Sequence, residues 1–264
     1  MTRWSSVSSD SFGALVDDVL IRITYTADFL FLTGATGFIH VANDMTGSRD
    51  PAVAIPRAVH GALNALKASA REPGMRRFVY TSSTTAATMP KPGVKFTIHA
   101  DTYNDEAAEE AWKPNADRHV VYAASKTAAE RAVFEWVEEN KPPFVVNAGN
   151  GYRTELGVLL SPANDFAVLP NCNIGPLISA ANQGYPTTAR FVKGLWDGDY
   201  EALRGNPPEH FVNVQDVGRL HVVGLASPDV KGERILAATA PFNFNGIIEV
   251  LRKICPERKW EDYP

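Results

Sequence analysis

A tyrosine and a lysine stand four residues apart in the stretch Tyr122-Ala-Ala-Ser-Lys126. If this stretch is helical, both side chains project from one face of the helix as neighbours. A lysine ammonium beside a phenol favours the phenolate, lowers the tyrosine pKa and makes the tyrosine usable for proton transfer near neutral pH. An exposed helical pair without a chemical role fits the same spacing, so residues elsewhere in the chain must decide.

A cluster of hydroxyl side chains, Thr81-Ser82-Ser83, closes a buried strand expected over residues 76–83. Parallel sheets place ligands and catalytic groups at the carboxyl ends of their strands. A serine hydroxyl there could hydrogen-bond a substrate carbonyl while Tyr122 protonates it. Ser83 could also be a simple cap at a strand end, but the nearby tyrosine and lysine favour the catalytic interpretation.

Alternating elements surround these residues. Alanine, leucine and valine recur at helical spacing over 53–71, with Pro56 in the expected first turn, and a long polar loop leads from the strand at 76–83 to about residue 117. A second helix is expected over 119–139, followed by a buried strand at 143–148. This order predicts an α/β protein whose parallel sheet is covered by helices.

The C-terminal part carries weaker signals. Asp216 is a suitable N-cap for the helical stretch "VGRLHVVGLA", and "IIEVLRKIC" predicts a short final helix.

Several stretches together resemble one known family. "RRFVYTSSTTAAT", "VYAASKTAAERA", "ENKPPFVVNA" and "VLPNCNIGP" are similar to segments of the extended short-chain dehydrogenase/reductases, within the NAD-dependent epimerase/dehydratase superfamily. The nearest likeness is to the dihydroflavonol-reductase-like aldehyde and ketone reductases. The resemblance implies a Rossmann-like, doubly wound parallel sheet with a small C-terminal substrate lobe.

The resemblance also implies roles for individual residues. Ser83 would polarise the substrate carbonyl, Tyr122 would be the acid, and Lys126 would hold the nicotinamide ribose. Tyr122 and Lys126 thus count as cofactor-binding too, together with Leu169-Pro170-Asn171, which resembles the segment that passes the nicotinamide amide. Hydride would come from NADP or NAD in reduced form, since no side chain can supply it, and the family resemblance alone favours NADPH.

The same superfamily contains nucleotide-sugar epimerases and dehydratases. Dehydratases place an acidic pair directly after the strand-end hydroxyl, whereas Ser83 is followed by Thr84-Thr85-Ala86-Ala87. The sugar-nucleotide members also favour an aromatic residue at the position of Pro170. Both departures favour a reductase that acts on a small-molecule carbonyl substrate.

The stretch "FLFLTGATGFIHVAND" at 29–44 could be read as a phosphate-binding loop. Gly34 and Gly37 have the required spacing, but His40 stands where a glycine or alanine is needed, and no helix follows directly. The family has a second place with this spelling, a Gly-Ala-x-Gly turn that leads into an apolar strand. We therefore interpret the stretch as that strand, and Gly34 and Gly37 are cofactor-binding candidates only if the loop interpretation holds.

This interpretation predicts that the first βαβ unit, with the phosphate loop and the residue that distinguishes NADP from NAD, is missing. The expected organisation is an irregular segment at 1–33, a Rossmann-like core at 34–176 and a substrate-binding lobe at 177–264, short at its C-terminus. Residues 149–167 are an expected insertion, because they interrupt a strand that should run from "FVVNA" into "VLPNCNIGP". A second hypothesis follows: a non-catalytic remnant of such a reductase that cannot hold the cofactor.

Composition sets outer limits. The 264 residues are 45% hydrophobic and 21% charged, with a net charge of −4, which gives no reason to expect nucleic-acid or membrane binding. Two cysteines form no framework, as expected for a cytoplasmic protein, and the six histidines show no metal-binding spacing. The substrate and the oligomeric state stay undetermined by the sequence.

Overall fold

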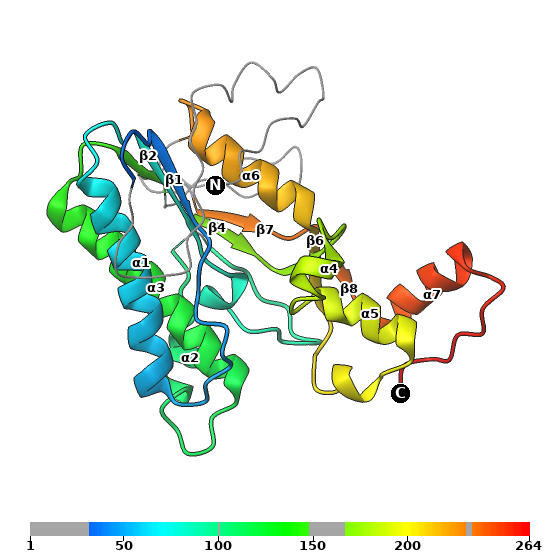
Figure 1. Cartoon of the computed structure of the whole chain (residues 1–264). Helices are drawn as coiled ribbons and strands as arrows, with labels where there is room; N and C mark the ends of the chain where they lie inside the picture. The colour runs from blue at the N-terminus through cyan, green and yellow to red at the C-terminus, as the bar shows by residue number, and fades with distance from the viewer. Residues whose placement is uncertain (1–31, 100, 148–166, 231–233) are drawn as a thin grey trace, which may run out of the picture.

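The computed structural model describes residues 32–99, 101–147, 167–230 and 234–264. The strands of its larger sheet are all paired in parallel, in the order β1-β2-β4-β7, with β3 also on β2. Their bounds are Gly37–His40 for β1, Arg77–Thr81 for β2, Val145–Asn147 for β3, Ala167–Pro170 for β4 and Arg234–Ala237 for β7. The predicted α/β architecture with a parallel sheet is confirmed (Figure 1).

Strands β3 and β4 occupy one continuous line along β2. Val79 of β2 lies opposite Asn147, and the next residue, Tyr80, lies opposite Ala167. The register therefore passes from Asn147 to Ala167 without a gap, as expected if the two stretches are halves of one strand. Residues 149–166 of the expected insertion lie outside the described residues, and Ala167 itself is the first residue of β4.

Helices cover both faces of the parallel sheet (Figure 1). Helices α1 (Pro51–Ala70) and α3 (Arg118–Asn140) pack on the face that carries Phe78 and Tyr80, whereas α6 (Val214–Ala226) packs on the face that carries Val79. Successive side chains of a strand point to opposite faces, so the apolar run of β2 serves both layers. This is the doubly wound arrangement that the resemblance implied.

Local capping corrects several predicted helix bounds. The Asp50 carboxylate accepts the Ala52 N–H at 2.9 Å and starts α1 at Pro51, so Pro56 lies inside the helix and not in its first turn. Helix α6 is capped by Asn213 and not by Asp216, because the Asn213 side chain accepts the Gln215 N–H and places Asp216 within the first turn.

The predicted loop between β2 and α3 contains two short helices. A 3₁₀ turn, η1 (Thr84–Ala86), follows β2, and α2 (Asp105–Glu110) begins at Asn104, whose side chain accepts the Ala107 N–H. A continuous polar loop to residue 117 was therefore a wrong prediction.

A smaller sheet and a helical layer lie beside the parallel sheet in the described structure (Figure 1). Leu195, Leu203 and Ile248 are buried in a separate apolar core there. The sheet has the order β5-β6-β8, with β5–β6 parallel and β6–β8 antiparallel. The bounds are Cys172–Ile174 for β5, Ala180–Gln183 for α4, Ala189–Asp197 for α5, Glu201–Leu203 for η2, Glu209–Asn213 for β6, Ala240–Phe242 for β8 and Phe244–Ile254 for α7. Helix α6 and strand β7 lie within the range 177–264 expected for the lobe, yet they belong to the layers of the parallel sheet.

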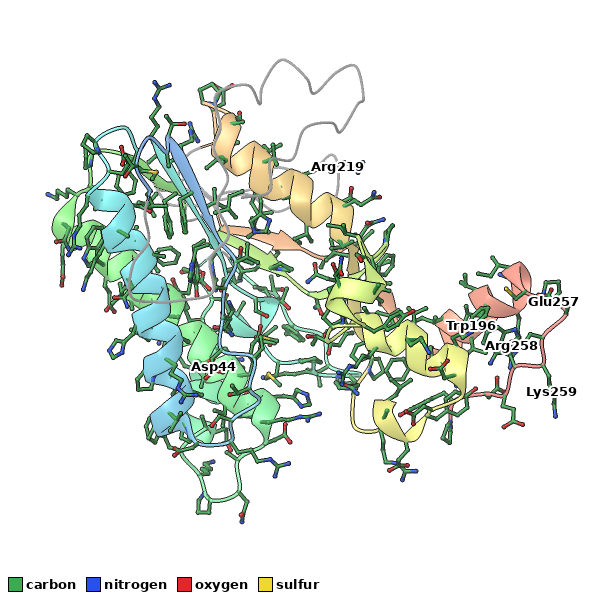
Figure 2. All side chains as sticks on the ribbon, in the orientation of Figure 1. Asp44, Trp196, Arg219, Glu257, Arg258 and Lys259 are labelled. Atoms are coloured by element: carbon green, nitrogen blue, oxygen red, sulfur yellow. The ribbon has the colours of Figure 1, made fainter. Side chains whose placement is uncertain are left out.

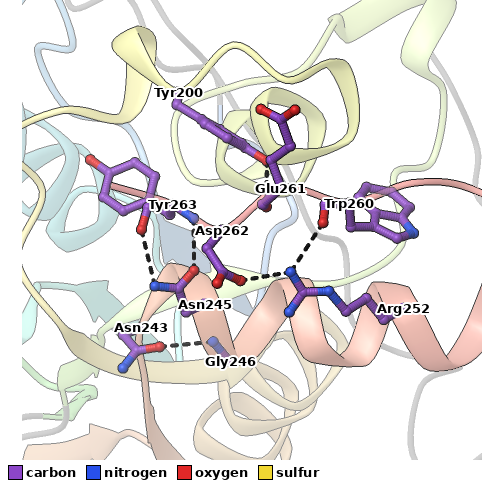
Figure 3. Close-up of polar contacts among 9 residues, drawn as sticks. All are labelled: Tyr200, Asn243, Asn245, Gly246, Arg252, Trp260, Glu261, Asp262 and Tyr263. Atoms are coloured by element: carbon purple, nitrogen blue, oxygen red, sulfur yellow. Dashed lines mark hydrogen bonds and ion pairs between the residues drawn. The ribbon is translucent and has the colours of Figure 1, made fainter.

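The segment after α7 folds back along that helix (Figure 3). The Asn245 side chain exchanges two hydrogen bonds with the Tyr263 backbone, at 3.1 and 2.7 Å, and Arg252 pairs with Asp262 at 2.6 Å. The Arg258 guanidinium lies over the Trp196 ring at 4.8 Å, and Figure 2 shows these two side chains together while Lys259 points away. These contacts hold the end of the chain on the lobe.

Candidate functional site

The candidate site lies at the carboxyl end of β2, where three successive hydroxyl side chains point in different directions. The Thr81 hydroxyl faces α6 and donates to Nε2 of His221 at 2.6 Å, while Nδ1 of His221 donates to the Val217 carbonyl. Burial lowers the His221 pKa, which keeps this imidazole neutral and Nε2 free to accept. Ser82 faces α3 instead and donates to a carboxylate oxygen of Glu130 at 2.5 Å.

Ser83 and Tyr122 share one environment. The Ser83 side chain neighbours the Tyr122 phenol and lowers its pKa against the effect of burial, although Ser83 caps η1 and Tyr122 lies on α3. Ser83 Oγ also accepts from the backbone N–H and the hydroxyl of Thr85, at 3.2 and 2.9 Å. These bonds fix the position of the serine oxygen.

Lys126 lies one turn along α3 and is buried beneath the same strand end. Its ammonium donates to the Thr81 carbonyl at 2.9 Å and lies 5.4 Å from the centre of the Tyr80 ring. Burial lowers the Lys126 pKa to about 8, and the Glu130 charge acts in the opposite direction. Titration of this amine therefore lies near physiological pH.

The sequence predicted that Lys126 lowers the Tyr122 pKa, and the structure does not agree with this prediction. The Tyr122 pKa is raised, chiefly by burial, and the Ser83 side chain lowers it only in part. The lysine ammonium is turned to the Thr81 carbonyl, so it does not compensate for the lost hydration of the phenolate. In this arrangement Tyr122 is a protonated phenol at neutral pH.

His40 of β1 lies close to Lys126 of α3. The ring belongs to β1 and stacks on Tyr80, with centroids 5.9 Å apart. Burial, followed by the Lys126 charge, lowers the His40 pKa to about 4, so the imidazole is neutral near pH 7. This residue is therefore part of the packed wall around Lys126.

The segment Leu169-Pro170-Asn171 ends β4 next to the site. Leu169 and Pro170 are buried, and the Ser82 N–H donates to the carbonyl of the neighbouring Val168 at 2.8 Å. Two residues further, Oδ1 of Asn173 is buried and has no hydrogen-bond partner among the described residues. A buried acceptor of this kind suits a ligand that offers an N–H group.

Gly34 and Gly37 lie at the amino ends of the parallel strands, opposite the carboxyl ends where Ser83 lies. Gly37 is the first residue of β1, and Gly34 turns the chain just before it with φ +78°. Because β1 and β2 are parallel, this turn is at the amino ends of the strands, opposite Ser83. A Cβ on Gly37 would meet Leu225 of α6 at 2.7 Å, so the absence of a side chain allows a helix to pack on the strand.

Metal-binding clusters and reactive thiols would be further candidate sites in the described part of the chain. No group of three or more His, Cys, Asp or Glu side chains there could hold a metal ion. Burial and the neighbouring Glu209 raise the pKa of the Cys172 thiol, which disfavours the reactive thiolate. None of the helices in this part is long and apolar enough to cross a membrane.

Sequence reasoning missed three residues that the fold brings to this site. Glu130, Arg234 and His221 come from α3, β7 and α6, and all three are buried polar side chains. Only Glu130 had a local signal, since it follows Lys126 by four residues on the same helix.

The sequence of the chain is similar to those of several known proteins. A family model described as the NAD dependent epimerase/dehydratase family matches residues 26–152. Aldehyde reductase 2 of Sporidiobolus salmonicolor is 32% identical over 270 residues, which cover 99% of this chain and 72% of that protein. Ketoreductase adrE of Penicillium rubens is 35% identical over 226 residues, covering 84% of this chain and 60% of that protein.

A solved structure shares the fold. The NADPH complex of Gre2 from Candida albicans has a TM-score of 0.65 and 20% sequence identity, and the match covers 84% of this chain and 62% of that one. The chain thus spans only part of the length of each of these proteins.

Proposed function

Because the chain belongs to the NAD-dependent epimerase/dehydratase family, and relatives about 30% identical are aldehyde and ketone reductases, we propose that it reduces an aldehyde or ketone to an alcohol. The observation that carries the proposal is that Ser83, at the carboxyl end of β2, neighbours Tyr122 of α3. Parallel sheets bind ligands at that edge, and the pair offers one group to polarise a carbonyl and one to protonate it.

Each side chain has a distinct role in the proposed reaction. The Ser83 hydroxyl donates a hydrogen bond to the substrate carbonyl oxygen and draws electron density away from the carbonyl carbon. Tyr122 then donates its phenolic proton to that oxygen as the alcohol forms. Its raised pKa suits this role, because a buried phenol holds its proton until negative charge develops on the substrate.

Lys126 stabilises Tyr122 after the phenol has given its proton to the substrate. Loss of the proton leaves a phenolate in a buried setting, and a nearby ammonium stabilises that charge. With a pKa of about 8, the amine is mostly charged at pH 7. We propose that it exchanges its bond to the Thr81 carbonyl for the ribose hydroxyls of the cofactor.

The described residues fit the nicotinamide end of a dinucleotide. When bound, the reduced nicotinamide supplies the hydride that no side chain can provide. Tyr122, Lys126 and the Leu169-Pro170-Asn171 segment would line it, and the unpaired Oδ1 of Asn173 could accept from a carboxamide N–H. We propose NADPH as this cofactor, which the Candida albicans structure contains, with NADH as the alternative.

The proposed substrate is a small carbonyl compound. The absence of an acid after Ser83 disfavours the dehydratase alternative, as does Pro170 at the position where sugar-nucleotide enzymes carry an aromatic residue. A cytoplasmic location stays a prediction from composition.

Replacing Tyr122, the proposed proton donor, tests the proposal directly. Purified protein is assayed for NADPH oxidation with a panel of aldehydes and ketones, and Tyr122→Phe is expected to lower kcat by about a hundredfold or more. Tyr185→Phe is the matched control, because this tyrosine is exposed in the lobe and should change kcat little. Undiminished turnover by Tyr122→Phe would remove the tyrosine from its proposed role.

Two observations favour the second candidate, a scaffold whose described residues form no phosphate site. The Gly34–Gly37 turn lies at the wrong edge of the sheet, and the N-termini of α1 and α3 are capped by Asp50 and Asp117, whose carboxylates would repel a phosphate. This second candidate predicts weak or undetectable cofactor binding by this chain. Titration of NADPH against the fluorescence of the five tryptophans measures it, and binding well below micromolar would refute this expectation.

A further inference from the structure

We propose that Glu130 is a positioning residue for the proposed reductase site, which ties the strand end carrying Ser83 to the helix carrying Tyr122 and supplies the negative charge that faces Lys126. This inference rests on the proposed function for its meaning, while its test does not depend on turnover.

Glu130 joins three elements at one buried point. Its Oε1 accepts from Nε of Arg234 on β7 at 2.6 Å, and its Oε2 accepts from the Ser82 hydroxyl at 2.5 Å and from Nη2 of Arg234 at 3.5 Å. The side chain of Glu130 is fully buried and that of Arg234 is 2% exposed. Helix α3, the end of β2 and β7 are therefore held in one arrangement by a single carboxylate.

Arg234 extends this connection to the loop before α2. Its Nη1 donates to the Thr102 carbonyl at 2.5 Å, and its guanidinium lies 4.5 Å from the centre of the Tyr103 ring. A buried ion pair offers little stability over well-packed apolar side chains, because both charges lose their hydration. The Glu130–Arg234 pair instead fixes the relative positions of α3, β7 and the end of β2, because its hydrogen bonds are directional and apolar contacts are not.

The bond to Ser82 holds the chain that follows β2 against α3. Ser83 follows Ser82 directly, and its side chain neighbours Tyr122, which lies two turns before Glu130 on the same helix. Glu130 thus acts on the catalytic pair through Ser82 and without touching substrate.

The charge of Glu130 acts on Lys126 as well. The two residues are four apart on α3, and Glu130 is the one described group whose charge raises the Lys126 pKa against the effect of burial. The other groups that face the lysine carry no negative charge: neutral His40 from β1, the Tyr80 ring and Thr81 carbonyl from β2, and protonated Tyr122 from α3. His221 of α6 bonds to the Thr81 hydroxyl and is neutral.

The test follows the titration of Lys126 itself, without cofactor or substrate. Protein with ¹³C-labelled lysine is titrated by NMR, and the Lys126 Cε signal is assigned by its loss in Lys126→Met. Glu130→Gln keeps the shape but removes the charge, and a nearby opposite charge commonly changes a pKa by a unit or more. We expect the Lys126 acid dissociation constant to increase at least about tenfold.

The matched control is Ser82→Ala, which removes a bond to Glu130 and keeps its charge. It should change the Lys126 dissociation constant by less than about threefold. An unchanged constant in folded Glu130→Gln would overturn the proposal, and so would an equal change in both variants, because that would indicate general loosening of the site.

Glu130→Gln leaves Arg234 buried without its anion and could fail to fold. The double variant Glu130→Gln/Arg234→Met then decides, because replacing both partners of a buried pair is tolerated better than replacing one. The same increase in the dissociation constant supports the proposal, and no increase overturns it. Neither result bears on Tyr122→Phe turnover, so failure of this inference is distinguishable from failure of the proposed function.

Discussion

Lys126 is expected to destabilise the fold that contains it. Burial lowers its pKa from 10.5 to about 8, and this difference corresponds to about 3 kcal/mol against folding at neutral pH. In Lys126→Met the buried ammonium is replaced by an apolar side chain of similar length. The variant leaves the Thr81 carbonyl without its donor, which costs about 1–2 kcal/mol, so the net gain at pH 7 is about 1–2 kcal/mol.

The pH dependence has a defined sign. The folded protein releases the lysine proton near pH 8, whereas the unfolded chain releases it near 10.5, so the unfolded state binds more protons between these values. Wild-type stability therefore rises relative to Lys126→Met as pH increases through this window, by about 2 kcal/mol between pH 8 and 9.5. Below about pH 7, where the lysine is protonated in both states, the difference between the two proteins is constant.

Urea unfolding of both proteins at intervals from pH 6.5 to 9.5 measures the difference in unfolding free energy. Lys67→Met, at an exposed position in the last turn of α1, is the control for adding a methionine and should change stability by less than about 0.5 kcal/mol at pH 7. A difference between wild type and Lys126→Met that stays flat from pH 8 to 9.5 would show that the amine is not held in a desolvated site, and the reasoning about its role would fail.

Two further predictions concern the sheet beside the site. Gly37→Ala places a Cβ 2.7 Å from Leu225 and should destabilise the protein by about 1–3 kcal/mol through overpacking of α6 on β1; chemical denaturation measures this, and unchanged stability would contradict the packing described for the strand. His40→Phe keeps an aromatic ring in the stack but removes an imidazole whose pKa is lowered from 6.5 to about 4. Wild type should therefore lose up to about 3 kcal/mol as pH falls from 6.5 to 4, because the unfolded chain takes up the proton first, and the Phe variant should lack this part of the loss. Parallel acid titrations of both proteins, followed by circular dichroism, would contradict this if they coincided.

The sequence by itself identified β2, α3 and the residues of the proposed catalytic pair. Buried apolar runs and helical periodicity identify β2 and α3, and local spacing places Tyr122 and Lys126 on one helix face. A hydroxyl at the end of a strand is also a local feature, so Ser83 could be named in advance. These inferences depend on neighbours within about one helical turn, which a sequence displays directly.

The tertiary structure decided which charges and caps act on those residues. Glu130 and Arg234 are far apart along the chain and meet only because β7 lies on the same sheet as β2. The rise in the Tyr122 pKa depends on burial and on the direction of the Lys126 ammonium, and neither follows from the spacing. Strand register likewise joins Asn147 to Ala167 across a long interval of sequence. Desolvation and pairing act between segments that the fold brings together, so the sequence order alone does not contain them.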